Sequence, residues 1–349
     1  MRLPLKSPLT AAWLFSAAFL IIVLVAVGGA TRLTQSGLSI TDWKPISGVI
    51  PPRTDADWRA EFDNYKKIPQ FSQINPHMKM AQFKGIFWWE WTHRLIARVV
   101  VGVVFFGGFV ILLLLRQIPA RLIWRCAGLF VLGGAQGGVG WLMVASGLSK
   151  RVSVAPEMLA AHLFMALLLL IATVWTALEA LEGEKRGRGA PGGWMTATVI
   201  LLVLVVLQCV LGAFVAGNQA GLVYNDWPLM NGHVLPPAGG SHDAMGVLHD
   251  QGVVQFVHRC NAYLLLIYVT AFAVFLSRKA QDDGLKFTAV ALAVLVWAQA
   301  TLGVVTLVTV VAFGFALSHQ VLAACLVALT TSLTWMMARA DRVFRRGRF

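Results

Sequence analysis

Eight long apolar runs limit what this 349-residue chain can fold into more than any other feature. Each run approaches or exceeds the roughly 18 apolar residues typical of a membrane-spanning helix. Backbone groups in lipid must be satisfied internally, and the runs are too long for barrel strands, so they are predicted to be helices. The first is expected to be a retained helix rather than a signal peptide, because no clear cleavage site follows it. The predicted spans are roughly 11–30, 92–115, 122–145, 158–180, 194–217, 253–276, 287–311 and 314–338.

The net charge of +13 follows the topology of these helices and does not indicate a nucleic-acid partner. Basic residues gather in the two tails and in the loops on one side of the membrane, whereas the opposite loop 218–252 has none. The other opposite loop, 31–91, has eight, but long loops cross largely regardless of charge. This is the positive-inside pattern, and it places both termini of a multi-pass protein in the cytoplasm. The residues concerned are Arg2, Lys6, Arg116, Arg121, Arg125, Lys185, Arg186, Arg188, Arg278, Lys279, Lys286, Arg339, Arg342, Arg345, Arg346 and Arg348.

The two halves of the chain resemble each other. "GGATRLTQSGLSITDWKPISGVIPP" at 28–52 corresponds to "GAFVAGNQAGLVYNDWPLMNGHVLPP" at 212–237, and "WTHR" at 91–94 corresponds to "FVHR" at 256–259. Each stretch ends a predicted helix, passes an Asp-Trp pair and reaches Pro-Pro. The sequence therefore predicts an all-α integral membrane protein made of two pseudo-symmetric four-helix bundles, 1–185 and 186–349.

Four histidines occupy matching places in these halves. His93 and His258 begin the second apolar run of each half, and His162 and His319 begin the fourth. Ionisable groups at membrane depth are rare and point to function. Two imidazoles from facing helices, with no thiol or carboxylate ligand nearby, suit a six-coordinate haem iron better than zinc. The alternative is that each histidine caps a helix or bonds a carbonyl at the membrane interface.

An arginine follows one histidine in each half. Arg94 and Arg259 are positioned to pair with haem propionates, although snorkelling to the interface is the alternative. The halves differ one turn earlier, where Glu90 corresponds to Gln255. An electron-transfer haem needs no acid or base, whereas a haem undergoing chemistry does. We therefore expect the chemistry in the first half and a resident cofactor in the second, with a simple Glu90–Arg94 ion pair as the alternative.

Several longer motifs resemble the heme A synthase family, in its proteobacterial and mitochondrial branch. They are the segment 28–52, "EFDNYKKIPQF", "QFKGIFWWEWTHRLIAR", "AGLVYNDWPLMNG" and "QFVHR", and the likeness runs from about residue 25 to residue 320. The resemblance implies an eight-helix membrane oxidoreductase that oxidises the C8 methyl of heme O to a formyl group. Its product, heme A, serves cytochrome oxidase.

The resemblance also implies roles for individual residues. His258 and His319 would be the axial ligands of a resident haem b, while His93 and His162 would bind the iron of the substrate haem. Glu90 matches the family's essential glutamate. Implied partners are heme O, the synthase that supplies heme O, membrane lipid and an unidentified electron acceptor. Whether the chain forms a homo-oligomer stays open.

The cysteines depart from the pattern of many relatives. Cys126, Cys209, Cys260 and Cys325 all lie in apolar runs, so we expect no structural disulfide and no cysteine pair in an outer loop. Two other functions remain as alternatives. A bis-histidine electron carrier would hold two equivalent haems and would not need Glu90. A repeat-built transporter would show broken helices and charges at the membrane midplane, whereas the helices here are expected to be continuous.

Overall fold

The computed structural model describes residues 6–183, 194–236 and 244–346, and within these ranges it is helical with no β-strand. The elements in the connecting loops are η1 (Ser47–Val49), α2 (Asp55–Tyr65), α3 (Pro69–Ile74), η3 (Ala220–Leu222) and α9 (Ala244–Val247). The remaining elements are α1 (Pro8–Leu33), α4 (Met80–Arg98), η2 (Val99–Gly107), α5 (Gly108–Leu114), α6 (Ala120–Ala145), α7 (Pro156–Glu182), α8 (Trp194–Gly217), α10 (Gln251–Lys279), α11 (Asp283–Val308) and α12 (Phe313–Arg346).

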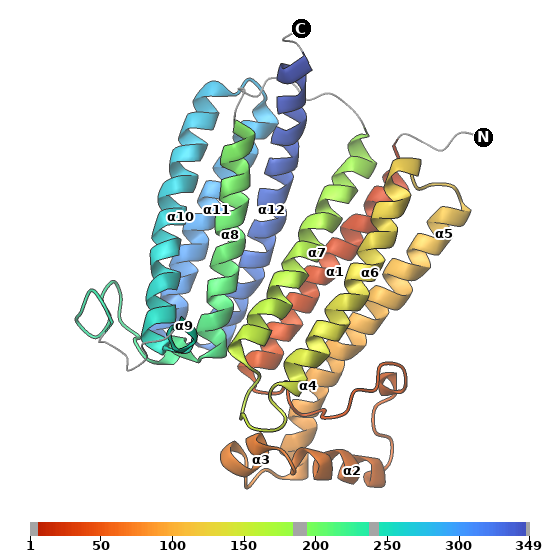
Figure 1. Cartoon of the computed structure of the whole chain (residues 1–349), viewed down its shortest axis with the longest axis vertical. Coiled ribbons are helices and arrows are strands. Elements are labelled where there is room, and N and C mark those ends of the chain that lie inside the picture. The colour runs from red at the N-terminus through yellow and green to blue at the C-terminus, as the bar shows by residue number, and fades with distance from the viewer. Residues whose placement is uncertain (1–5, 184–193, 237–243, 347–349) are drawn as a thin grey trace.

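Eight helical stretches in the described residues are long and apolar enough to cross a membrane, which confirms the predicted number. They are α1, the continuous rod α4–η2–α5, and α6, α7, α8, α10, α11 and α12. Figure 1 shows α1 and α4–α7 as one group of rods and α8 and α10–α12 as another. This arrangement is consistent with the predicted pseudo-symmetric bundles. The first turn of α1 and the last turn of α12 lie at the same end, opposite α2, α3 and α9 (Figure 1).

Local sequence signals set the ends of several helices. Ser7 caps α1 by accepting a hydrogen bond from the Thr10 amide at 3.1 Å, and a proline follows at the first helical position. Asp250 and Asp282 cap α10 and α11 in the same way, each at 2.9 Å. Gly183 ends α7 with a φ of 65°, a conformation that glycine adopts without strain.

The second span differs from the prediction in two ways. Its helix begins at Met80, twelve residues before the expected start, because residues 80–91 are mixed in polarity and do not register as an apolar run. The helix is also not uniformly α: nine residues, Val99–Gly107, form a π-helix. The indole of Trp13 on α1 donates to the Val104 carbonyl at 2.8 Å, which satisfies a backbone group there.

The two groups of helices meet along α1, α7, α8 and α12, through a shared apolar core that includes Leu14, Leu170, Leu201 and Val327. Polar contacts also cross this boundary in the described residues. Arg32 at the end of α1 donates to the Ala216 carbonyl of α8 at 2.8 Å. Gln320, next to His319 on α12, donates to the Val25 carbonyl of α1 at 2.9 Å.

A second, smaller core covers the outer end of α4. Its aromatic members come from α2 and the first turns of α4, and they are Trp58, Phe62, Tyr65, Phe83 and Phe87. Aliphatic residues from the adjoining segments complete it, namely Leu38, Ile40, Ile68, Val144 and Val154. Phe62 and Phe83 stack with ring centroids 4.9 Å apart, and Trp58 meets Phe87 edge to face at 4.9 Å. The long first outer loop is therefore a packed cap, and it fixes the end of α4 that carries Glu90 and His93.

Part of the topology prediction falls outside the described residues. Arg2, Lys185, Arg186, Arg188 and Arg348 lie there, as does the proposed boundary between residues 185 and 186.

Candidate functional site

All four histidines lie toward the same end of the bundle, near the outer ends of α4, α7, α10 and α12. His162, His258 and His319 are in the second turn of their helices, but His93 is thirteen residues into α4 because that helix starts early. The expectation that His93 opens its helix is therefore wrong, although it does open the apolar run. That each pair shares one haem iron stays a prediction.

Each histidine ring rests against a glycine of the preceding spanning helix. A Cβ atom placed on Gly28 or Gly212 would lie 3.1 or 3.2 Å from Cε1 of His93 or His258. The same atom on Gly140 or Gly303 would lie 2.8 Å from Cε1 of His162 or His319, which is closer than real Cβ contacts. Any larger residue at these four positions would displace the imidazole.

Three of the four histidines are each contacted by a different glutamine. Gln136, Gln208 and Gln299 stand four residues before Gly140, Gly212 and Gly303. Their amide nitrogens donate to the backbone carbonyls of His162, His258 and His319 at 3.0, 3.1 and 2.9 Å. The amide nitrogens of Gln136 and Gln208 also lie 3.2 Å from Nδ1 of their histidines.

These residues fit a haem. Each pair supplies two imidazoles, the number needed by an iron that already has four porphyrin ligands. Within the described ranges, no three His, Cys, Asp or Glu side chains gather as a protein-only metal site. Nδ1 of His93 and of His319 is buried without a hydrogen-bond partner, which is unusual for a polar atom and typical of functional sites.

Glu90 is 3% exposed and lies one helical turn before His93. Its carboxylate accepts from the Ser39 hydroxyl at 2.7 Å, the Ile40 amide at 2.9 Å and the Arg94 guanidinium at 2.6 Å. The ion pair considered as an alternative is therefore present. A carboxylate has about four acceptor positions, so three donors leave roughly one for a substrate or a water.

Gln255 takes the corresponding place in the second half, but it donates hydrogen bonds to its loop, whereas Glu90 accepts them. Its amide nitrogen donates to the Ala220 and Tyr224 carbonyls at 2.8 and 3.3 Å. Its oxygen accepts from Arg259 at 2.9 Å. Both residues thus join a helix, an arginine and an outer loop, but only the first carries a charge.

Arg94 and Arg259 reach the outer loops. Arg94 donates to the Ile40 carbonyl at 2.8 Å and the Asp42 carbonyl at 3.2 Å. Arg259 donates to the Leu229 carbonyl at 2.9 Å and to those of Tyr224 and Asp226 at 3.1 Å. Each guanidinium therefore ties its loop to the helix that carries the adjacent histidine. Nε of Arg259 is buried without a hydrogen-bond partner. Pairing of Arg94 and Arg259 with haem propionates stays a prediction.

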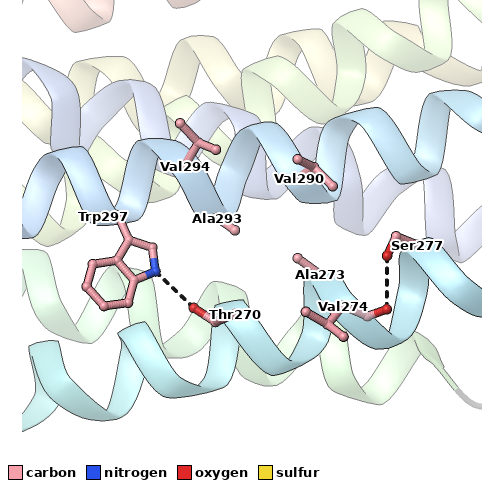
Figure 2. A pocket seen from close by; sticks show the side chains of 8 residues that line it. All are labelled: Thr270, Ala273, Val274, Ser277, Val290, Ala293, Val294 and Trp297. Atoms are coloured by element: carbon pink, nitrogen blue, oxygen red, sulfur yellow. Dashed lines mark hydrogen bonds between the residues drawn. The ribbon is translucent and has the colours of Figure 1, made fainter.

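The grooves on the surface lie elsewhere. An apolar groove of about 360 Å³ lies between α10 and α11. The indole of Trp297 donates to Thr270 in it at 3.0 Å. Figure 2 shows the residues that line this groove. A neighbouring groove of about 540 Å³ shares Trp297 and Thr270. Neither contains a predicted site residue, and their apolar lining suits hydrocarbon chains of the membrane.

Sequence analysis missed the three glutamines and two contacts of Glu90, those with Ser39 and Ile40. A spaced signal was nonetheless present: Gln-x-x-x-Gly occurs at 136–140, 208–212 and 299–303, always in the helix before a histidine-bearing helix. The four cysteines are free thiols, as expected.

Comparison with known proteins agrees with the resemblance. Residues 11–331 match the COX15-CtaA family, described as cytochrome oxidase assembly protein. A protein named heme A synthase from Caulobacter sp. (strain K31) is 51% identical over 96% of this chain and 97% of its own length. Heme A synthases from Caulobacter vibrioides and Maricaulis maris are 48% and 43% identical, each over 96% of this chain and over 97% and 98% of their own lengths.

Proposed function

The chain belongs to the COX15-CtaA family of cytochrome oxidase assembly proteins, and from this premise we propose that it is a heme A synthase, a membrane oxidoreductase that converts heme O to heme A. In the reaction that we propose, the C8 methyl group of heme O becomes a formyl group. The observation that carries this reading is the repeated histidine pair with an ionisable Glu90 in one half and a neutral Gln255 in the other.

The second half would hold a resident haem b, with His258 and His319 as its axial ligands. A bis-histidine haem has no open position, so its chemistry there is the passage of electrons. The protein's part is to fix the two imidazoles. Gly212 and Gly303 give them room, and Gln208 and Gln299 hold the backbone of their helices.

The first half would bind the substrate, heme O, through His93 and His162. Glu90 is the proposed catalytic carboxylate. Its acceptor capacity not used by Ser39, Ile40 and Arg94 can take a proton from water or from the reacting methyl, or set the local charge. Arg94 and Arg259 are proposed partners for the propionates, because each is a cation fixed beside its histidine at the outer end of the bundle.

The setting follows from these assignments. The protein is a multi-pass membrane protein, and we place it in the bacterial inner membrane with both termini in the cytoplasm. The domains would be 1–185 for the substrate and 186–349 for haem b. Its partners would be a heme O synthase and an electron acceptor, while membrane lipid accommodates the apolar tail of heme O.

Chromatography of the extracted haems tests this function. The protein is purified after expression with and without a heme O synthase. Haem b is expected in both preparations, and heme O, oxidised intermediates and heme A only in the first. Two equivalents of haem b under both conditions, with no modified haem, would instead identify an electron carrier.

A further inference from the structure

Three of the four histidines are held by a glutamine from the preceding helix, which we call the amide clamp (Gln136, Gln208 and Gln299). Each clamp joins two neighbouring helices at the histidine itself, through bonds of 2.9–3.1 Å to the histidine carbonyl. The clamp on His258 is further fixed, because Asn261 donates to the oxygen of Gln208 at 2.7 Å.

The fourth histidine has no clamp. His93 rests on Gly28 of α1, and the residue four positions before Gly28 is Leu24. A leucine side chain cannot donate to the His93 carbonyl or contact a ring nitrogen. Nδ1 of His93 is buried without a partner. Nδ1 of His319 is in the same state, but Gln299 still holds the carbonyl of that residue at 2.9 Å.

Outer contacts of this kind control how firmly a histidine binds a metal. The best-known contact of this sort accepts a hydrogen bond from the second ring nitrogen, and its loss typically lowers metal affinity about 10- to 100-fold. The clamps act instead on the backbone that carries the ring, through the histidine carbonyl. A histidine without such a contact can leave the iron at lower cost than its clamped partner. The unclamped histidine lies on the same helix as Glu90, where the first half already differs from the second.

We propose that His93 is the releasable axial ligand of the substrate haem, because Leu24 replaces the glutamine that holds the other three histidines. Gln136, Gln208 and Gln299 are then positioning residues for His162, His258 and His319. This inference rests on the proposed function, since it takes the first pair to bind heme O. Release of His93 opens one position on the substrate iron on the side of Glu90, while haem b stays closed on both sides.

Carbon monoxide is a direct probe, because it binds ferrous haem only where an axial position opens. The wild-type protein is purified after expression with a heme O synthase, reduced with dithionite and exposed to CO. Difference spectra report the fraction of the haem that binds CO, and A-type haem is distinct in them because its formyl group is conjugated with the ring. The variants below assign the remaining signal to one half. We expect CO to bind the haem of the first half and not haem b. Leu24→Gln should lower the CO-reactive fraction about tenfold, whereas the size-matched Leu24→Ile should not change it.

The reciprocal variant acts on the other half. Gln208→Leu should make haem b CO-reactive and shift its midpoint potential, with the first haem unchanged. Because this experiment measures CO binding and the midpoint potential of haem b, it works even with a preparation whose substrate site carries little haem. Gln136→Leu should raise CO binding in the first half, and it covers the case in which Leu24→Gln does not fold.

Two results would overturn the proposal. One is a first-half haem that refuses CO in the wild type or binds it equally in Leu24→Gln. The other is a Gln208→Leu protein whose haem b excludes CO and keeps the wild-type potential. Failure of the proposed function is separate, since it appears in the extracted haems as an absence of heme A in the wild type.

Discussion

Replacing Glu90 with glutamine is expected to abolish heme A formation and to leave haem b in place. Glutamine has nearly the volume of glutamate, so the change removes a charge without opening a cavity. The second half shows that an amide is compatible with this position, because Gln255 accepts from Arg259 at 2.9 Å in the corresponding place. Haem b should be retained because His258 and His319 belong to the other group of helices (Figure 1).

The structural cost of this change can be worked out from three contacts. If the glutamine oxygen keeps the bond to Arg94, the NH₂ group of the glutamine would face the Ile40 N–H. In the wild type this N–H donates to the Glu90 carboxylate at 2.9 Å. One hydrogen bond to a charged group is lost, about 1.5–3 kcal/mol, and one buried N–H is left unpaired, about 1–3 kcal/mol. Arg94 keeps its bonds to the Ile40 and Asp42 carbonyls. We therefore expect about 2.5–6 kcal/mol of local destabilisation, which loosens the outer loop without unfolding the bundle.

The assay separates chemistry from anchoring. Wild type, Glu90→Gln and Ser39→Ala are each expressed with a heme O synthase. Haem b is quantified from the reduced spectrum, and heme A by chromatography of the extract. Ser39→Ala removes one donor but keeps the carboxylate, so it should retain heme A formation. Wild-type yields of heme A from Glu90→Gln would refute a catalytic role. Equal loss in Ser39→Ala would show that Glu90 acts only by holding the loop.

Three further predictions concern the second half. Gly303→Ala should lower haem b content more than Gly212→Ala, measured as haem per protein, because its Cβ would lie 2.8 Å rather than 3.2 Å from the imidazole. Gln255→Glu should lower the free energy of unfolding by about 2–4 kcal/mol, because a carboxylate cannot donate to the two carbonyls that the amide now bonds. An unchanged melting curve would contradict this. Hydrogen bonds from the Asn231 and Gly232 amides lower the pKa of Asp226 below its ordinary 3.8. The contribution of Asp226 to its turn is therefore present above that value and is lost as pH falls through the lowered pKa. Asp226→Asn should remove this contribution at neutral pH and speed proteolysis of the loop there, and an unchanged cleavage rate would contradict this.

The sequence predicted the eight spans because lipid requires uninterrupted apolar helices, and that pattern is visible residue by residue. It could not place the start of α4, since residues 80–91 alternate polar and aromatic side chains and belong to a cap outside the apolar run. The π-helix at Val99–Gly107 was equally hidden, because its apolar residues suit an α-helix as well. Its carbonyl at Val104 is satisfied by Trp13, which is 91 residues away.

The candidate site was predictable to the extent that duplication repeats it. His93, His162, His258 and His319 stand out because each half contains a matching pair. The glutamines do not stand out, since a single Gln in an apolar helix has no evident partner until the facing helix is known. Their role emerges only when Gln208 is seen to reach the His258 carbonyl at 3.1 Å.

The outer loops show that the difference between Glu90 and Gln255 extends beyond one residue. The first loop offers a hydroxyl and an amide, from Ser39 and Ile40, and these require an acceptor. The second loop offers the carbonyls of Ala220 and Tyr224, and these require a donor. Each loop therefore matches the residue beneath it, and a simple exchange of the two side chains would leave both loops unsatisfied. Because the unclamped His93 lies on the same helix as Glu90, the departures from symmetry gather around one histidine, which is where a substrate rather than a resident cofactor would have to be handled.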